Sequence, residues 1–350
     1  PIALQSPPCK TKGQSEHTDQ PNVKRMNGMA NLIFTHQACG LHGDVRASDG
    51  ESVPRGWGHP EQPLRLDAVM QGLSASPALA AVERREPGKA NPERLKTLHG
   101  QSYVDAMLQP VPSGVVDWYD ADTGRTRGTP DAALLAAGGA IEAAEMAMSN
   151  QPIDRIFVAT RPPGHHAEAN RAMGFCFFGN VALAANRALE MGANRVAVLD
   201  FDVHHGNGTQ ALLWDNPDTL FVSSQQMPLW PGSGSADETG AHGDNVMNIP
   251  LGSGTTSAGF LEAWKPALDR VDALEPDLIV ISAGFDAHAD DPLAGLNVEE
   301  DGFADLTAQI VALADSHCGG RVVSVLEGGY DLPALSRSVA AHASALFQGV

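Results

Sequence analysis

Short apolar runs alternate with longer amphipathic segments along most of this chain, from about residue 29 onward. The short runs are rich in β-branched and aromatic residues and predict buried strands at residues 32–34, 156–158, 196–199, 220–222, 278–281 and 322–326. The longer segments predict helices at residues 131–148, 181–191, 258–274, 303–314 and 332–347. Because strands that alternate with helices build parallel sheets covered on both faces, the pattern predicts an α/β fold. We expect a single domain of three layers, in which helices flank a central, mainly parallel sheet.

The first 28 residues lack this alternation. They are rich in Pro, Gln, Lys, Ser and Thr and carry almost no periodic apolar residues, so they cannot offset the entropy cost of becoming ordered. We therefore predict a disordered leader at residues 1–28 and one folded domain at residues 29–350. No internal repeat or linker interrupts the pattern within that domain.

The composition disfavours several classes of partner. With 42 acidic and 23 basic side chains, the chain has a formal net charge of -19, which disfavours nucleic acid as a partner. The same charge favours cationic ligands such as lysine-rich peptides or polyamines. No apolar run approaches the length of a membrane span, so no membrane partner is predicted. Cys9, Cys39, Cys176 and Cys318 form no C-x-x-C pair, which is typical of a protein in a reducing cytoplasm.

The polar residues after one predicted strand have the chemistry of metal ligands. Asp200, Asp202 and His204 alternate directly after an apolar run. Alternate side chains of an extended segment point to the same side, so two carboxylates and an imidazole can face one ion. Ligands of this kind suit a catalytic divalent metal. An acidic turn closed by Gly206 and Gly208 is an alternative explanation of the same pattern. This segment alone does not decide between a metal site and such a turn.

Three other predicted strands also end in residues with reactive side chains. R-P-P-G-H-H at 161–166 follows one strand, S-A-G-F-D-A-H at 282–288 follows another, and E-G-G-Y at 327–330 follows the last. In open α/β sheets the ligand site lies outside the carboxyl ends of the strands. Four strand ends that deliver His, Asp or Tyr to one rim indicate a site far more strongly than any single motif.

Together these motifs resemble the histone deacetylase family, which also includes acetylpolyamine amidohydrolases and acetoin-utilisation proteins. The resemblance runs from His36 and the segment G-H-P-E-Q-P-L-R-L at 58–66 to Tyr330. The chain is similar to the second branch of the family, which carries Asn at position 207 and Glu before Gly-Gly-Tyr, where the first branch carries Asp and Gly. The resemblance implies an arginase/deacetylase-like arrangement of the predicted layers, with residues 29–350 as the deacetylase catalytic domain.

The resemblance also implies the metal sites. It makes Asp202, His204 and Asp286 the ligands of one catalytic zinc ion, an open site with room for water and a substrate carbonyl. Whether the native metal is zinc or ferrous iron stays open. A potassium ion is expected beneath that site, held by oxygens of Asp200, Asp202, His204 and Ser223. No organic cofactor is implied.

Five residues receive catalytic roles from the resemblance. His166 would act as general base and then as general acid, while His165 would act electrostatically. Asp200 would accept a hydrogen bond from His165, and Asn207 would orient His166. Tyr330 would donate a hydrogen bond to the oxyanion of the tetrahedral intermediate.

A narrow tunnel for the acylated side chain is implied as well. Gly174 with Phe175 and Leu229 with Trp230 match the segments that form its two walls, and Trp230 stands where the family usually carries Phe. A core position for Trp230 is the alternative reading. Leu293 matches a rim position that is apolar in protein deacetylases and acidic in some polyamine deacetylases.

These assignments predict a zinc-dependent amidohydrolase that removes acetyl or related acyl groups from acyl-lysine side chains of proteins or peptides. One alternative is a deacetylase of acetylpolyamines or other cationic small-molecule amides. Another is an arginase-like dimanganese hydrolase, which would need more carboxylate ligands than the motifs offer. A third is a non-catalytic acyl-lysine binding protein, although Tyr330 and both tandem histidines are present. The acyl-chain length, the physiological substrate and homo-oligomer formation stay open.

Overall fold

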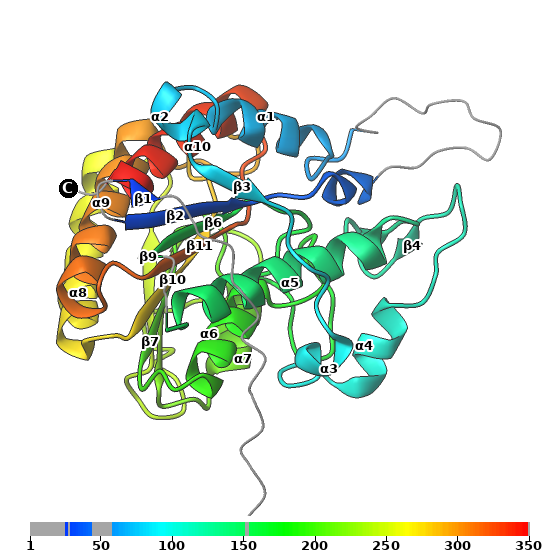
Figure 1. Ribbon diagram of the computed structural model, residues 1–350, viewed down its shortest axis with the longest axis horizontal. Helices are drawn as coiled ribbons and strands as arrows, with labels where there is room; N and C mark the ends of the chain where they lie inside the picture. Colours follow the sequence, from blue (N-terminus) through cyan, green and yellow to red (C-terminus); the bar gives the residue numbers. More distant parts are fainter. Residues whose placement is uncertain (1–24, 27–28, 44–57, 151–153, 349–350) are drawn as a thin grey trace, which may run out of the picture.

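A nine-stranded sheet runs through the middle of the molecule (Figure 1). The computed structural model describes residues 25–26, 29–43, 58–150 and 154–348. Along the sheet the strands follow the order β1 (Arg25–Met26), β2 (Met29–Phe34), β6 (Arg155–Val158), β11 (Val322–Leu326), β10 (Leu278–Ala283), β7 (Val196–Asp200), β8 (Thr219–Gln226) and β9 (Val246–Leu251). The short β3 (Glu83–Arg85) also pairs with β2. Only the pairing of β1 with β2 is antiparallel among the described strands of this sheet, so the predicted, mainly parallel sheet is confirmed.

Helices cover both faces of the sheet, which makes the three layers visible in Figure 1. One face packs against α5 (Thr129–Ala147) and α6 (Asn180–Glu190). The other face packs against α1 (Leu64–Gly72), α8 (Ser257–Leu274), α9 (Glu300–His317) and α10 (Leu332–Gln348). Successive side chains of strand β10 point to opposite faces of the sheet. Leu278 and Val280 pack on the face covered by α5 and α6, and Ile279 and Ile281 pack on the other face.

Several elements lack a signal in the apolar pattern. They are η1 (Gln37–Leu41), α2 (Pro77–Ala80), α3 (Pro92–Leu95), α4 (Gln101–Met107), α7 (Asn207–Leu213) and the hairpin of β4 (Asp117–Trp118) with β5 (Gly124–Arg125). Most are only one or two turns long, too short to show a period. Strand β9 was also not predicted, because Asn248 and Pro250 interrupt its apolar residues. Its place at the end of the sheet suits a proline, which cannot donate a ladder hydrogen bond.

The predicted leader overlaps the first strand of the sheet. Arg25 and Met26 pair with β2, although the sequence places both in the leader. Residues 1–24 and 27–28 lie outside the described residues, so disorder there, and the domain boundary with it, stays a prediction. No helix among the described residues is long and apolar enough to cross a membrane.

The carboxyl ends of β6, β11, β10 and β7 meet at one edge of the sheet. These strands are consecutive neighbours and all run parallel. The loops that follow them carry the four polar motifs of the sequence. The parallel arrangement therefore brings segments more than 100 residues apart to one place, such as His165 and Asp286.

Candidate active site

Two carboxylates and an imidazole converge where β7 and β10 end. One potential ligand atom from each of Asp202, His204 and Asp286 lies within 4.8 Å of the others. The His204 Nδ1 atom is 3.3 Å from Asp202 Oδ1 and 3.1 Å from Asp286 Oδ2. Both aspartates are fully buried, and the His204 side chain is 11% exposed. The geometry therefore brings together the three residues that the sequence singles out as metal ligands.

Backbone groups orient both carboxylates. Gly328 N donates to Asp202 Oδ2 at 2.9 Å, and Val203 N donates to Asp286 Oδ1 at 2.9 Å. A Cβ atom on Gly328 would lie 2.2 Å from Asp286 Oδ2, so only glycine lets this loop approach so closely. The ligand oxygens are thus held in place by the chain itself.

The charge of this group matches a divalent cation. Two buried carboxylates side by side are costly unless a positive charge accompanies them. Burial alone would lower the pKa of His204, but hydrogen bonds to Asp202 and Asp286 raise that pKa to about 10. An imidazole that gains a proton so readily occupies a place suited to a cation. One nitrogen and two carboxylate ligands fit zinc and leave a coordination position open.

The tandem histidines each contact the partner predicted from the sequence. His165 Nδ1 donates to Asp200 Oδ2 at 3.0 Å, and His166 Nδ1 donates to Asn207 Oδ1 at 2.8 Å. Burial would lower the pKa of His165, but the carboxylates of Asp202 and Asp200 outweigh it and raise that pKa well above the usual value. Burial and the neighbouring His165 charge hold the pKa of His166 well below the usual value. The pKa values of the two adjacent imidazoles are therefore shifted in opposite directions.

The loop that carries Tyr330 is fixed by an aspartate outside the predicted site. Asp291 Oδ2 accepts hydrogen bonds from the backbone of Tyr330 at 2.7 Å and of Asp331 at 3.4 Å. The other oxygen of Asp291 accepts from Leu293 N at 3.0 Å, which ties the rim residue to the same loop. Burial raises the pKa of Tyr330 well above its usual value, so the phenol keeps its proton and can donate it in a hydrogen bond.

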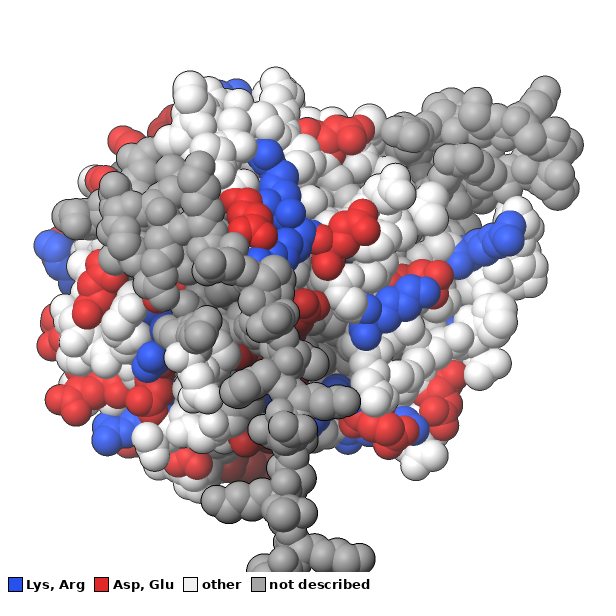
Figure 2. All heavy atoms as spheres, in the orientation of Figure 1, with Lys and Arg blue, Asp and Glu red and all other residues white. Residues whose placement is uncertain are grey.

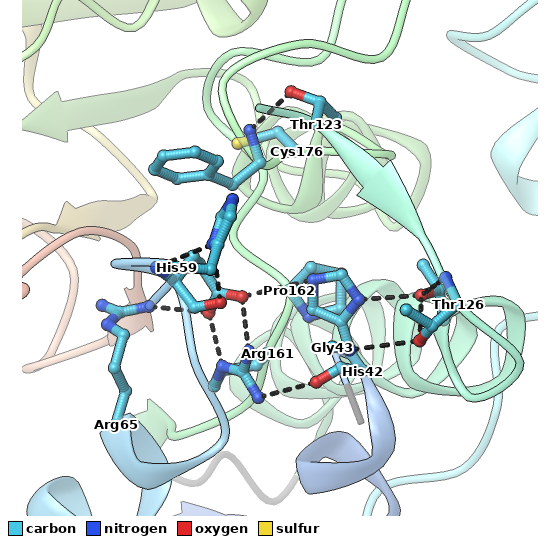
Figure 3. A network of polar contacts seen from close by, with 12 residues as sticks. His42, Gly43, His59, Arg65, Thr123, Thr126, Arg161, Pro162 and Cys176 are labelled. Carbon is cyan, nitrogen blue, oxygen red and sulfur yellow. Dashed lines mark hydrogen bonds and ion pairs between the residues drawn. The ribbon is translucent and has the colours of Figure 1, made fainter. Parts of the chain in front are cut away.

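A buried ionic network that includes Arg65, Arg161 and His42 (Figure 3) contacts the Tyr330 loop. Glu61 accepts from Arg65 Nη1 at 3.0 Å and pairs with both Arg161 and His42. Arg65 also donates to the backbone oxygens of Gly329 at 2.7 Å and Glu327 at 2.5 Å, and its Cζ atom lies 4.9 Å from the centre of the Tyr330 ring. The network therefore anchors the tyrosine loop to α1.

Aromatic side chains contact two residues of the candidate site, His166 and Tyr330. The Trp230 ring centre lies 4.7 Å from that of His166, and a Cβ atom on Gly174 would clash with both rings, at 2.4 Å from His166 and 2.6 Å from Trp230. The Phe175 ring centre lies 5.8 Å from that of Tyr330. Trp230 is 47% exposed, so the alternative reading of a core residue is wrong. Leu229 is half-buried and packs against the core. Of the predicted wall residues Leu229 and Trp230, Trp230 is the one whose ring contacts His166.

A second group of potential ligands does not suit a metal. His288, Glu299 and Glu300 also bring ligand atoms within 4.8 Å of one another. However, His288 Nδ1 accepts from Asp290 N at 3.0 Å, so its proton lies on Nε2, the nitrogen that faces the glutamates. Glu300 is in addition paired with Arg337. The described residues thus offer one suitable ligand trio, which does not supply the extra carboxylates of a two-metal arginase-like site.

Comparisons with known proteins agree with this geometry. The model of the histone deacetylase domain matches residues 59–346. A probable deacetylase of Archaeoglobus fulgidus is 38% identical over 283 residues, which cover 78% of this chain and 77% of that protein. The chain belongs to the histone deacetylase family.

Other members of the histone deacetylase family support the same conclusion. A histone deacetylase-like amidohydrolase of Pseudomonas aeruginosa is 38% identical over 288 residues, covering 79% of this chain and 74% of that protein. The crystal structure of the HDA15 HD domain superposes with a TM-score of 0.82 at 31% identity and covers 92% of this chain and 89% of that one. This histone deacetylase family member is therefore an enzyme that hydrolyses amide bonds, and the predicted family, fold and enzyme class are confirmed.

Three acidic residues of this deacetylase contact the site in roles that the sequence did not assign to them. Asp291 holds the Tyr330 loop, as described above. Glu327 Oε2 accepts from the backbone of Gly164 at 2.6 Å and His165 at 3.1 Å, and burial raises the pKa of Glu327 to about 7. Glu168 contacts Asn207. Glu327 begins the E-G-G-Y motif, and Asp291 and Glu168 lie within a few residues of other recognised motifs.

Proposed function

We propose that this enzyme is a zinc-dependent deacylase of acyl-lysine side chains in proteins or peptides. The observation that carries the proposal is the buried trio of Asp202, His204 and Asp286 beside two histidines, each held by a hydrogen bond through Nδ1. Zinc bound there would polarise the amide carbonyl and lower the pKa of a bound water molecule.

The neighbouring residues supply the proton transfers. His166 is neutral and its Nδ1 atom donates to Asn207, so its Nε2 atom is free to take a proton from water. The same Nε2 atom then gives that proton to the departing lysine amine. His165 stays protonated next to Asp200 and stabilises negative charge that develops at the carbonyl. Tyr330 keeps its phenolic proton and donates it in a hydrogen bond to the oxyanion.

The aromatic border suits the stem of an acyl-lysine. Phe175 and Trp230 are large apolar rings next to Tyr330 and His166, respectively. Apolar walls favour the methylene groups of a lysine stem, while the amide end reaches the metal trio and the peptide backbone stays outside. Leu293, linked to the Tyr330 loop through Asp291, adds no carboxylate for the distal ammonium group of a polyamine.

We expect kcat/KM to be higher for acetyl-lysine peptides than for acetylputrescine or acetylspermidine. A distal ammonium group at a partly desolvated rim is costly without a carboxylate partner, and Leu293 cannot be one. The measurement is kcat/KM for both substrate classes with zinc-loaded enzyme at physiological salt. The acidic surface, where basic groups lie beside acidic ones (Figure 2), attracts both classes of cation and does not separate them.

Leu293→Glu should shift the kcat/KM ratio towards acetylpolyamines, and Leu293→Gln is the matched uncharged control. An advantage of about tenfold or more for acetylpolyamines in the wild-type enzyme would overturn the preference for peptides and support the polyamine alternative, since one unpaired cation at the rim is worth at least that factor.

We also propose a potassium ion near the end of β7. Asp200 is fully buried, and burial raises the pKa of its carboxyl group to about 6 although His165 contacts it, so a further positive charge would stabilise this carboxylate. Ser223 of β8 is the register partner of Asp200, so both residues can face one ion together with the oxygens of Asp202 and His204. We expect activity to rise when potassium replaces tetramethylammonium at constant ionic strength. Equal activity in the two salts would contradict the site.

A further inference from the structure

We propose that Glu168 is a positioning residue that fixes the amide orientation of Asn207 and thereby the nitrogen of His166 that carries a proton. Nothing in the sequence motifs assigns it a role. The inference rests on the proposed function, because it assumes that His166 acts as the base.

Three side chains form a chain of hydrogen bonds that ends at the base. Asn207, the first residue of α7, donates from Nδ2 to Glu168 Oε1 at 3.0 Å. Its Oδ1 atom accepts from His166 Nδ1 at 2.8 Å. The remaining neighbour of Asn207 Nδ2 is the Met173 sulfur at 3.5 Å, a weak acceptor that also suits an N–H group.

The backbone of Glu168 is held independently of this contact. Glu168 N donates to Arg171 O at 3.0 Å. Gly179 N donates to His99 Nε2, so His99 carries its proton on Nδ1 and donates it to Glu168 O at 3.0 Å. The backbone position from which the Glu168 side chain reaches Asn207 is therefore fixed by other contacts.

The chemistry of the three groups permits one arrangement. An amide has almost the same shape after its oxygen and nitrogen exchange places, so shape alone does not orient Asn207. An ionised carboxylate only accepts hydrogen bonds, so the NH₂ group of Asn207 must face Glu168 and the oxygen must face His166. His166 then carries its proton on Nδ1 and keeps a lone pair on Nε2.

The exchanged orientation would disable the base. It would point the NH₂ group of Asn207 at His166 Nδ1, which would have to accept. The proton of neutral His166 would move to Nε2, where no lone pair would remain to take a proton from water. An aspartate at position 207 would not need a neighbour to fix its orientation, since either carboxylate oxygen can accept the hydrogen bond from His166 Nδ1.

The test combines substitutions at 168 and 207. Glu168→Lys replaces the acceptor with a donor and favours the exchanged amide, so we expect kcat to fall about 100-fold, the size of a lost general base, with KM changed far less. Glu168→Gln still offers an amide oxygen and should stay within about threefold of the wild type. In the Asn207→Asp background, Glu168→Lys should cost no more than about threefold, since an aspartate cannot be misoriented.

A second readout does not depend on activity. In ¹⁵N-histidine-labelled, metal-free protein, NMR should show the His166 proton on Nδ1 in the wild type and Glu168→Gln, and on Nε2 in Glu168→Lys. The His166 signals are assigned by their loss in His166→Gln. If Glu168→Lys does not fold, Glu168→Met serves instead, and should show a mixture of the two tautomers.

Two outcomes would overturn the proposal. One is an unchanged His166 tautomer in the folded Glu168→Lys or Glu168→Met variant. The other is an equal loss of kcat from Glu168→Lys in the wild-type and Asn207→Asp backgrounds. If the wild-type enzyme hydrolyses no acyl-lysine substrate, the proposed function fails, yet the NMR result still decides the role of Glu168.

Discussion

Tyr330→Phe is expected to lower kcat by about 10²–10³-fold, the usual cost of one lost donor to an oxyanion. The phenol keeps its proton because burial raises its pKa, and Asp291 and Arg65 hold its loop in place. The lost hydrogen bond strengthens as charge develops on the substrate oxygen, so kcat falls while the affinity for a substrate-like inhibitor changes much less. Steady-state kinetics with an acetyl-lysine peptide and a parallel binding titration measure both quantities.

Tyr119→Phe is the matched control for that experiment. Tyr119 is 37% exposed and its hydroxyl group contacts only Asp117 among the hydrogen bonds of the described residues, so the same loss of one oxygen should leave kcat near the wild-type value. Wild-type turnover in Tyr330→Phe would remove Tyr330 from the mechanism.

Asp286→Asn is expected to abolish stoichiometric zinc binding and, with it, the activity. Mutation of a residue that only hydrogen-bonds to a metal ligand typically lowers metal affinity by about 10–100-fold. Loss of the charge of a ligand itself should therefore weaken zinc binding by more than about 100-fold. Metal analysis after dialysis should show about one zinc ion per wild-type chain and almost none in the variant.

The same substitution should not harm the metal-free protein. Asp202 and Asp286 are both fully buried and face the same imidazole, so removing one charge relieves repulsion. We expect the thermal midpoint of the metal-free variant to equal or exceed that of the metal-free wild type, and zinc to raise the midpoint of the wild type alone. Asp290→Asn, at an exposed residue paired with Arg337, is the control. Retention of one zinc ion by Asp286→Asn would contradict the ligand assignment.

The apolar pattern was sufficient for most of the central sheet because its strands are buried on both faces. Predicted strand 322–326 matches β11, and predicted helix 258–274 differs from α8 by one residue. Strand β8 extends four residues beyond the predicted 220–222, since Ser223 to Gln226 are polar yet belong to the sheet. Polar residues enter this strand because it borders the site, and periodicity does not reveal that.

The candidate site was predictable only where its residues follow strands. Asp202 and Asp286 closely follow the neighbouring parallel strands β7 and β10, so topology brings them together. Glu61 and Arg161 meet through loops 100 residues apart, and charged residues in a sequence give no sign that they are buried. The contact of Asp291 with the Tyr330 loop was likewise not predictable, because its partners there are backbone amides, which nearly every residue possesses.

The contact between Arg65 and the Tyr330 loop has a consequence for biosynthesis. The two segments are about 260 residues apart, and Arg65 reaches the backbone at both Glu327 and Gly329. During synthesis on the ribosome, Glu61 and Arg65 are made long before Glu327 and Gly329, the residues that Arg65 contacts in the folded protein. Glu61 can already pair with Arg65 and Arg161 in that interval. The site is therefore complete only after Glu327, Gly329 and Tyr330 have been synthesised and their loop has met Arg65.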